Sequence, residues 1–322
     1  MRGFTAFVAV ALCTAFAAFA QDTARPPIVG VLRIDTTADA LPSIAMYRDA
    51  LAALGYVDGN NLRLDIGLAE GDAERLPKLA EALVGEKVSV IYAAGPAAAR
   101  AARGATRTIP IVATASDLAA LGLIDSLAKP GGNITGVSLL IPELDAKRLE
   151  ILKEIIPSAR RFGVISDPAT SGPAGLQAIA SAARSLGVEL QTVQVRSPRE
   201  FPAAVASLGA TGVKGVSVLG SPLLFSSHKE LVKLLLAEKL PGICEWREMA
   251  ATGCLASYGT TRRETVAMVA ALIDKILRGA NPADTPAQQP TKFELVVNLK
   301  VAREIGVEIP AAILARADEV IE

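Results

Sequence analysis

The sequence predicts an α/β protein made of two similar Rossmann-like lobes, each with a parallel sheet, joined by a multi-strand hinge. Two observations lead to this fold class. From residue 27 onward, short apolar segments typical of buried strands alternate with amphipathic segments typical of helices, a pattern that indicates right-handed βαβ units on a parallel sheet. The same series of segments then returns at offsets of 126 to 133 residues. We therefore expect two lobes of one design.

The first lobe is expected to span residues 27–138. Its apolar segments VGVLR, VIYAA and IVATA are typical of strands buried on both faces. Its helical segments begin with residues that favour a helix start, such as Asp72 before an acidic first turn and Pro96 after Gly95. The predicted strands cover residues 27–35, 61–69, 88–94 and 109–115, and the predicted helices cover residues 41–55, 72–86 and 96–105.

The second lobe is expected to span residues 139–252. The turn at Gly131-Gly132 and the β-branched run after it form the passage between the lobes. Residues 253–285 are expected to return to the first lobe, so the chain crosses more than once, and the pattern does not assign residues 286–322 to either lobe. The predicted strands of the second lobe lie within residues 161–168, 188–197, 213–222 and 240–246.

Residues 1–20 read as a secretory signal peptide. Arg2 is followed by an apolar stretch and by the small-residue pattern Ala18-Phe19-Ala20. The alternative, an uncleaved membrane anchor, is disfavoured because the segment is shorter than a membrane span with its flanks, and Cys13 lacks the preceding small residue of a lipidation site. We expect a mature protein that is soluble and outside the cytoplasm.

The charges of the chain are balanced. Lys plus Arg and Asp plus Glu number 33 each, and removal of Arg2 with the signal peptide leaves 32 against 33. No run of like charges stands out, so the electrostatic footprint of a nucleic-acid-binding protein is missing. We expect no nucleic-acid partner.

Two cysteines, Cys244 and Cys254, remain after the signal peptide. In an oxidising compartment they could form a disulfide, because one would end a strand and the other would open the next. Two inert buried thiols are the alternative, and the sequence leaves both open.

The candidate ligand-binding residues follow the ends of the predicted strands. Ligands of open parallel sheets bind outside the carboxyl ends of the strands, near the unpaired N–H groups of helix starts. Small and hydrogen-bonding residues gather there in both lobes, although any single Asp, Ser or Thr could simply cap a helix. The candidates are Asp35, Thr36, Gly95, Pro96, Ala97, Ser116, Asp117, Asp167, Gly220, Ser221, Glu245 and Trp246.

Catalysis has little support in the sequence. His228 is the single histidine and falls in a first helical turn, which argues against histidine triads and histidine metal sites. No glycine-rich nucleotide loop follows a strand, so we expect no cofactor and no metal. The four strand-end carboxylates could act as acid and base, cap helices, or hold a ligand amine, and Trp246 could stack on a ligand or pack in the hinge.

Several segments carry a family resemblance, above all PGGNITG at 130–136 and QPTKFELVVNLK at 289–300. With LPKLAEALVGEKVSVIYAAGPAAARAA they closely resemble the ABC-transporter substrate-binding proteins of the tryptophan/aromatic amino-acid type, over about residue 27 to the end. The resemblance implies a type I periplasmic-binding fold and a monomer that captures a small molecule in the periplasm. It also implies two partners, a permease in the inner membrane and a separate ATPase that powers it. A module that senses a ligand for a membrane receptor would share the fold.

The strand-end loops depart from the pattern of that family. Ala94-Gly95-Pro96-Ala97 stands where Gly-Thr-Pro-Ala is usual, so a hydroxyl is missing, and Leu118 replaces a proline after Asp117. If the ligand is an amino acid or a related carboxylate, Asp117 or Asp35 could take an amine, and the helix starts after Gly95 and Gly220 could take a carboxylate. The resemblance leaves the ligand itself open.

Overall fold

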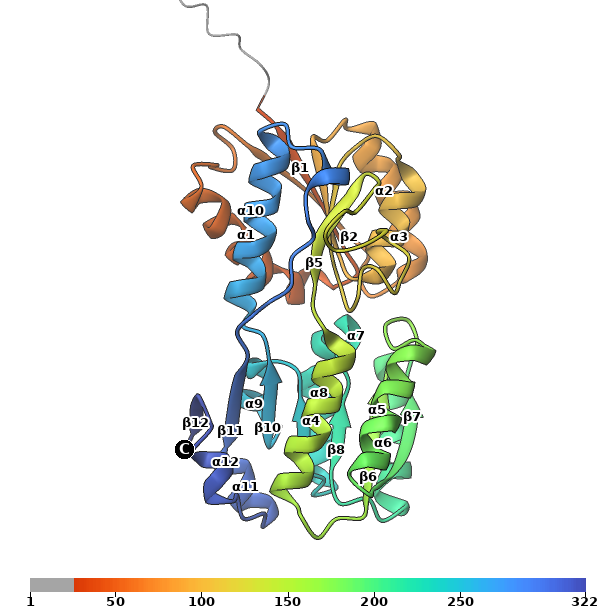
Figure 1. Cartoon of the computed structure of the whole chain (residues 1–322), viewed down its shortest axis with the longest axis vertical. Coiled ribbons are helices and arrows are strands. Elements are labelled where there is room, and N and C mark those ends of the chain that lie inside the picture. Colours follow the sequence, from red (N-terminus) through yellow and green to blue (C-terminus); the bar gives the residue numbers. More distant parts are fainter. Residues whose placement is uncertain (1–25) are drawn as a thin grey trace, which may run out of the picture.

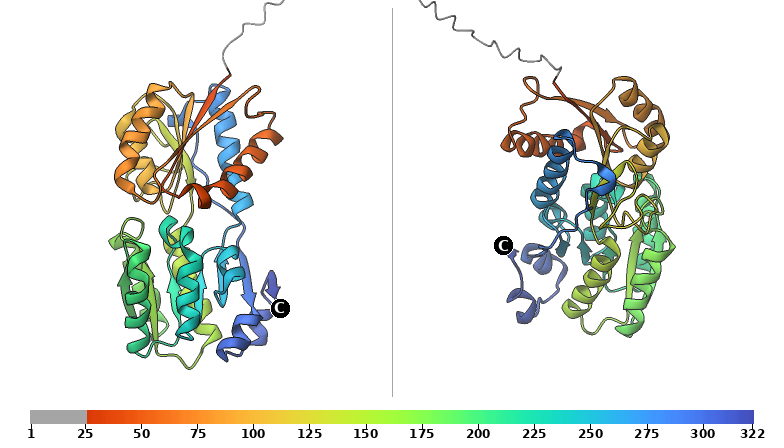
Figure 2. Two further views of the ribbon diagram at one scale, coloured as in Figure 1. Left: turned by 180° about the vertical axis from the view of Figure 1, so that it is seen from behind. Right: turned by 45° about the horizontal axis from the view of Figure 1, so that its top comes forward.

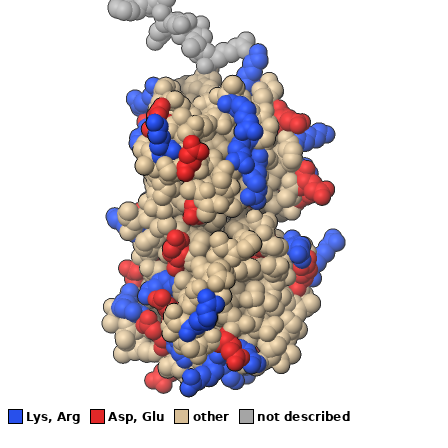
Figure 3. All heavy atoms as spheres, turned by 45° about the vertical axis from the view of Figure 1, so that its right-hand side comes forward, with Lys and Arg blue, Asp and Glu red and all other residues tan. Residues whose placement is uncertain are grey.

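The protein consists of two lobes stacked along its longest axis, as the computed structural model shows (Figure 1). The structure describes residues 26–322, and the predicted signal peptide lies outside the described residues. No helix in this range is long and apolar enough to cross a membrane. On the face shown in Figure 3, both lobes carry acidic and basic side chains, as the balanced composition leads one to expect.

The first lobe has a five-stranded parallel sheet in the order β2-β1-β3-β4-β5. Its central strands are buried on both faces, which explains their continuous apolar sequences. The strands are β1 (Ile28–Arg33), β2 (Arg63–Leu68), β3 (Val90–Ala94), β4 (Ile111–Ala115) and β5 (Ile134–Ser138).

Helices cover both faces of this sheet (Figure 2). Alternate strand residues divide between two clusters: Val29 and Val31 pack with α1 and α10, whereas Leu32 and Ile91 pack with α2 and α3. The helices are α1 (Thr37–Ala53), α2 (Leu76–Gly85), α3 (Pro96–Ala105) and α10 (Arg262–Leu277), with a 3-10 turn η1 (Ala73–Arg75) before α2.

The second lobe has a seven-stranded sheet in the order β12-β11-β10-β9-β8-β6-β7. Its members β7-β6-β8-β9-β10 repeat the order of the first sheet, and β11 is added antiparallel to β10. The predicted repetition of one design is confirmed. The strands are β6 (Arg161–Ser166), β7 (Glu189–Gln194), β8 (Val216–Val218), β9 (Gly242–Cys244), β10 (Ala256–Gly259), β11 (Glu294–Asn298) and β12 (Glu319–Ile321).

Helices again cover the second sheet on both faces, forming two apolar clusters. Leu149, Leu152 and Phe162 belong to one cluster, and Phe201, Leu231 and Cys244 belong to the other. The helices are α4 (Ile141–Ile155), α5 (Pro173–Ser185), α6 (Phe201–Ala210), α7 (Pro222–Ser226), α8 (His228–Ala237), α9 (Arg247–Thr252), α11 (Leu299–Ile305) and α12 (Ala311–Leu314), with 3-10 turns η2 (Pro198–Glu200) and η3 (Pro282–Asp284).

Within residues 26–322 the chain crosses between the lobes three times, between β5 and α4, between β10 and α10, and between η3 and β11 (Figure 1). The expectation that the return to the first lobe begins at residue 253 is wrong. The strand β10 pairs with β9 and β11, because it supplies the second lobe with the counterpart of β5. Only α10 and the segment after it join the first lobe. The strands β11 and β12 lie in the second sheet.

A disulfide joins Cys244, at the end of β9, to Cys254, just before β10, with their Cα atoms 6.4 Å apart. It closes a short loop that contains Glu245, Trp246 and the helix α9. Of the two alternatives that the sequence left open, the structure therefore has the disulfide. The bond ties the end of β9 to the residues just before β10.

Candidate ligand-binding site

A cavity lies between the lobes at the carboxyl ends of both sets of strands. It holds about 810 Å³ of space, including its opening to solvent. The first lobe contributes the ends of β1, β3 and β4 and the first turn of α10, and the second lobe contributes α7, the start of α4 and the residues after β9. Both lobes thus share one space, as in proteins that close around a ligand.

Arg33 and Asp35 form a buried ion pair at the end of β1. Val29 and Val31 point to the face covered by α1 and α10, and Arg33 follows at the same strand period. Its Nε donates to Oδ2 of Asp35 over 2.8 Å, and the two side chains are 10% and 6% exposed. Burial alone would lower the pKa of Arg33, but Asp35 and two nearby tyrosines together hold that pKa above its ordinary value. Arg33 is therefore a fixed cation.

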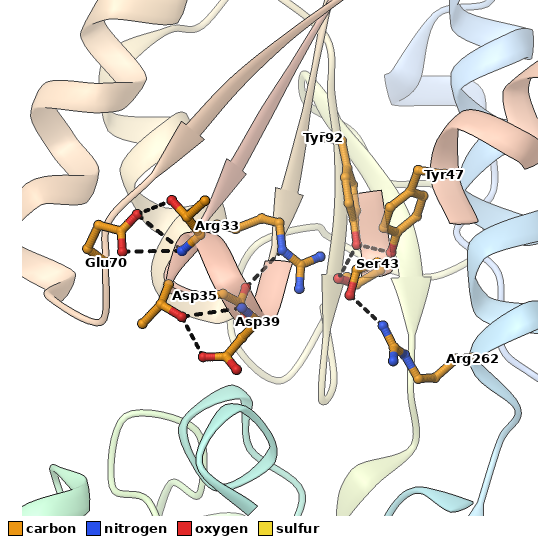
Figure 4. Close-up of polar contacts among 11 residues, drawn as sticks. Arg33, Asp35, Asp39, Ser43, Tyr47, Glu70, Tyr92 and Arg262 are labelled. Carbon is orange, nitrogen blue, oxygen red and sulfur yellow. Dashed lines mark hydrogen bonds and ion pairs between the residues drawn. The ribbon is translucent and has the colours of Figure 1, made fainter. Parts of the chain in front are cut away.

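Two phenols stand beside Arg33. Tyr47 from α1 and Tyr92 from β3 share a hydrogen bond of 2.5 Å between their hydroxyl groups, and the Tyr92 hydroxyl lies 3.4 Å from Thr114 Oγ1. Burial, and then the neighbouring phenol, raise the pKa of Tyr47 well above its ordinary value. Tyr47 is therefore neutral, and both tyrosines line the cavity (Figure 4).

Arg262 connects three elements at the first turn of α10. It donates to Ser43 of α1, pairs with Glu248 of α9 at 3.3 Å, and lies over the ring of Phe225, 5.1 Å from its centroid. Glu248 and Phe225 belong to the second lobe. Arg262 therefore bonds across the cavity as well as lining it.

The wall of the second lobe is aromatic. Phe225 of α7 meets Trp246 edge to face at 6.1 Å, and its other neighbour is the stacked ring of His228 at 5.4 Å. His228 Nδ1 lies 2.6 Å from the carbonyl oxygen of Phe225. Phe225 and Trp246 line the cavity whereas His228 does not. The only histidine of the chain thus supports an aromatic residue.

Glu245 faces the cavity above a buried charged pair. Behind it, Arg148 of α4 donates to Asp145 and, through Nε over 2.7 Å, to the carbonyl oxygen of Tyr258. Burial outweighs the attraction of Arg148 and raises the pKa of Glu245 to about 7, and burial likewise raises the pKa of Asp145 to about 6. Arg148 Nη2 has no hydrogen-bond partner among the described residues. The site therefore contains a carboxyl group that titrates near neutral pH.

The N–H groups at the two helix starts beside the cavity differ, because Ser221 caps α7 whereas α3 has no side-chain cap. Gly95 N–H donates to the carbonyl oxygen of Thr114, and Gly220 N–H donates to Asp145. Leu223 and Leu224 N–H both donate to Ser221 Oγ. Pro96 and Pro222 have no N–H at the first helical position. The start of α7 therefore offers few backbone donors to a ligand, whereas the N–H groups of Ala97 and Ala98 in the first turn of α3 are uncapped.

Seven of the twelve candidate residues line the cavity. Gly95 lies close to the second lobe, since a Cβ there would meet Pro222 Cγ at 3.2 Å. The seven are Asp35, Gly95, Pro96, Ser116, Ser221, Glu245 and Trp246.

The other five lie outside the lining of this cavity. Thr36 caps α1, Asp117 accepts from the N–H groups of Ala119 and Ala120, and Asp167 accepts from Ala169 N–H and from the hydroxyl of Ser221. Ala97 packs against the core, and Gly220 lies against Ile141 and Glu245. In the structure, the three polar residues of this group hold local backbone and side-chain groups.

Several lining residues were not among the candidates. Arg33 ends an apolar strand, and Tyr92 interrupts a buried one, so a polar group within a core strand was the available signal. Arg262 stands at a helix N-terminus, where the helix dipole disfavours a cation. An arginine at this position was therefore a second signal in the sequence. No comparable signal marked Tyr47, Thr114 or Phe225.

Comparisons with known proteins agree with this architecture. The family model described as ABC transporter substrate binding protein matches residues 39–321. The "Tyrosine-binding protein" of Clostridioides difficile is 30% identical over 254 residues, covering 77% of this chain and 72% of the relative. A conserved domain protein from Vibrio cholerae, 27% identical, matches with a TM-score of 0.86 over 92% of this chain and all of the other.

Two further similar structures differ in whether a ligand is bound. An ABC domain in complex with L-Trp from Streptococcus pneumonia gives a TM-score of 0.84, and a ligand-free, open substrate-binding protein with adhesive properties from Clostridium difficile gives 0.66, each at 25% identity over 92% of this chain and 99% of the other. The higher score with the ligand-bound structure fits the contacts across the cavity. The fold is the type I periplasmic-binding fold, and the chain belongs to the ABC transporter substrate-binding protein family.

Proposed function

We propose that this protein is the extracytoplasmic solute-binding component of an ABC importer. Its lobes close on a small molecule, an amino acid or a related carboxylate, and deliver it to a membrane permease driven by a separate ATPase. The observation that carries the proposal is the single cavity lined by both lobes, because such a site binds only when the lobes are together.

Two comparisons, the threading of the chain and the predicted signal peptide support the proposal. The L-Trp complex shows that a relative of this fold holds an amino acid, and the tyrosine-binding relative is named for another. The three crossings between the lobes form a hinge of three connecting segments (Figure 1). The predicted signal peptide at residues 1–20 would place the protein in the periplasm, where it acts as a monomer. It binds its ligand without chemical change.

Ligand-dependent stabilisation and closure test this function together. Mature protein is unfolded and refolded to remove carried-over ligand, and its thermal unfolding is followed with amino acids, aromatic metabolites and small carboxylates. A ligand present at 100 times its Kd should add about 2.7 kcal/mol to the free energy of unfolding. The same ligand should reduce the radius of gyration in small-angle X-ray scattering. Chemical conversion of the bound compound would contradict the proposal.

A further inference from the structure

Glu245 is a buried carboxyl group without a charged partner. It follows β9, is 6% exposed and lines the cavity, yet it forms no ion pair within residues 26–322. Its Oε2 lies close to Gly220 and Ile141, since a Cβ on Gly220 would stand 2.9 Å from that oxygen and 2.8 Å from Ile141 Cγ2. The carboxyl group thus stands between an apolar side chain and the cavity.

Arg148 has a donor without an acceptor behind Glu245. The Arg148 side chain is fully buried, and its Nη1 and Nε donate to Asp145 and to the Tyr258 carbonyl oxygen, but Nη2 has no partner among residues 26–322. Burial raises the pKa of Glu245 to about 7 although Arg148 attracts the ionised form. An ionised Glu245 must move toward Nη2 or be hydrated from the cavity, because a buried charge without a partner is costly. Ionisation therefore changes what this carboxyl group contacts.

Arg148 and Glu245 also hold residues that enter the hinge. The helix α4 begins directly after the crossing from β5, and Arg148 lies about two turns along it. Arg148 Nε donates to the carbonyl oxygen of Tyr258 over 2.7 Å, and a Cβ on Gly259 would meet the carbonyl oxygen of Glu245 at 2.4 Å. Tyr258 and Gly259 are the last residues of β10, before the crossing to α10. The two side chains thus act where two of the three connecting segments begin or end.

Most of the other charged groups around Glu245 are paired. Among them, Arg148 is the cation that favours ionisation of Glu245, and Asp145 is the carboxylate that opposes it. The remaining charged and titratable groups that line the cavity or the neighbouring hollow beside the hinge are Arg33 with Asp35, Arg262 with Glu248, Arg247 with Glu319, the tyrosines Tyr47 and Tyr92, and the unpaired Glu294 and Arg263.

We propose that Glu245 makes the opening of the two lobes depend on pH, so that the protonated side chain favours the lobes together and the ionised side chain favours an open arrangement. This inference rests on the proposed function, in which the lobes open and close. Opening the cavity brings water to the wall that Glu245 lines, and water stabilises the carboxylate. Closing therefore takes up a proton, and by linkage a lower pH favours closing.

Ligand affinity should follow the same dependence. A ligand that binds the closed form gains affinity from every shift of the population toward that form. The protein should therefore hold its ligand more tightly in an acidic medium than in a mildly alkaline one. The titration of one wall residue would then set how readily the ligand is released.

Small-angle X-ray scattering of the ligand-free mature protein tests the inference without a ligand. The radius of gyration is measured from about pH 5 to about pH 8 at constant ionic strength, a range that spans the ionisation of Glu245. We expect it to rise with pH in the wild type and to stay at its low-pH value in Glu245→Gln, which keeps the shape of the side chain and cannot ionise. Glu304→Gln, at an exposed position of α11, is the control and should behave as the wild type does. A wild-type radius that does not rise with pH, or a rise that persists in Glu245→Gln, would overturn the inference.

Isothermal titration with L-tyrosine and L-tryptophan provides a second measurement. Buffers of different ionisation enthalpy report the protons taken up on binding. We expect an affinity about tenfold or more higher at about pH 5 than at about pH 8, since one pKa unit corresponds to a factor of ten, together with proton uptake near neutral pH. Both effects should vanish in Glu245→Gln. An affinity that is equal at both ends of the range, or higher at about pH 8, would contradict the role of Glu245. If neither amino acid binds, the proposed ligand class loses its support, and the scattering comparison decides the present inference by itself.

Discussion

The guanidinium carbon of Arg262 lies 5.1 Å from the ring centroid of Phe225, and this contact joins the two lobes across the cavity. Arg262 belongs to the helix α10, which packs on the first sheet, and Phe225 belongs to the helix α7 of the second lobe. The same side chain pairs with Glu248 of the second lobe. Arg100 Nη2 donates to the carbonyl oxygen of Ala169 at a second point between the lobes. The structure is thus one in which the lobes touch.

Arg262→Ala should shift the protein toward an open arrangement. The substitution removes a cation over an aromatic face, worth about 0.5–1 kcal/mol at exposed sites, and a charged hydrogen bond to the second lobe. We expect a larger radius of gyration without ligand and an affinity lower by about tenfold. Arg263→Ala is the matched control, because Arg263 is the exposed neighbour. Equal scattering from both variants would count against this role of Arg262.

The free energy of unfolding of the ligand-free protein should fall as the pH rises toward neutrality. Burial raises the pKa of Glu245 from 4.5 to about 7, so between these values the folded state binds more protons than the unfolded state. The stabilisation of the protonated form is full below about pH 4.5 and is lost as the pH rises through about 7. The loss is on the order of 3 kcal/mol.

Glu245→Gln isolates this effect. The variant keeps the shape of the side chain but cannot ionise, so its free energy of unfolding should depend less on pH between about 5 and 7 and should exceed that of the wild type at neutral pH. Asp145, whose pKa is raised to about 6, retains its own smaller dependence. Denaturant unfolding at several pH values measures both. Parallel pH profiles for wild type and variant would contradict the prediction.

Reduction of the Cys244–Cys254 disulfide should destabilise the second lobe. The two cysteines are 10 residues apart in sequence, and a loop of this size is worth roughly 2 to 3 kcal/mol through the entropy of the unfolded chain. Protein unfolded and refolded with a phosphine reductant should melt several degrees lower than oxidised protein. Thiol titration of the unfolded, oxidised mature chain should find no free thiol. Two reactive thiols would show that the bond is absent in solution.

Gly136→Ala should prevent stable folding. A Cβ on Gly136, in β5, would collide with the backbone of Ala113 in the neighbouring strand β4. Neither strand can move away without breaking the sheet, so the expected loss is about 3 kcal/mol or more. Gly132→Ala provides the control, since a Cβ there would meet nothing within 4 Å. It should change the free energy of unfolding by less than about 0.5 kcal/mol. Comparable stability of the two variants would contradict this account.

Most of the fold could be predicted because each lobe repeats its apolar strands at similar spacing. The strands around Val31, Val90 and Val164 are plain in the sequence. The sheet to which β10 belongs could not be predicted, because its four residues, Ala256–Gly259, are as compatible with one sheet as with the other. Only the pairing with β9 and the antiparallel β11 fixes its place. Short strands of this kind depend on tertiary contacts.

The site was predicted in part, for a related reason. The strand-end rule found Asp35 and Glu245, which follow the last strand residue, but Arg33 and Tyr92 lie just before that point. Asp117 and Asp167 obey the same rule and serve as local caps, because a capping carboxylate and a ligand-binding carboxylate look alike in sequence. Tyr47 reaches the cavity from a helix, and its contribution depends on how that helix packs.

The order in which the chain supplies the elements of the first lobe affects its folding during synthesis. The first sheet has all its strands by Ser138, yet the apolar surface around Val29, Val31 and Tyr47 is covered only when α10 is added. During synthesis from the N-terminus, that surface therefore stays exposed while more than a hundred further residues are translated. A fragment cut after β5 would expose the same surface and should aggregate rather than fold as an independent unit.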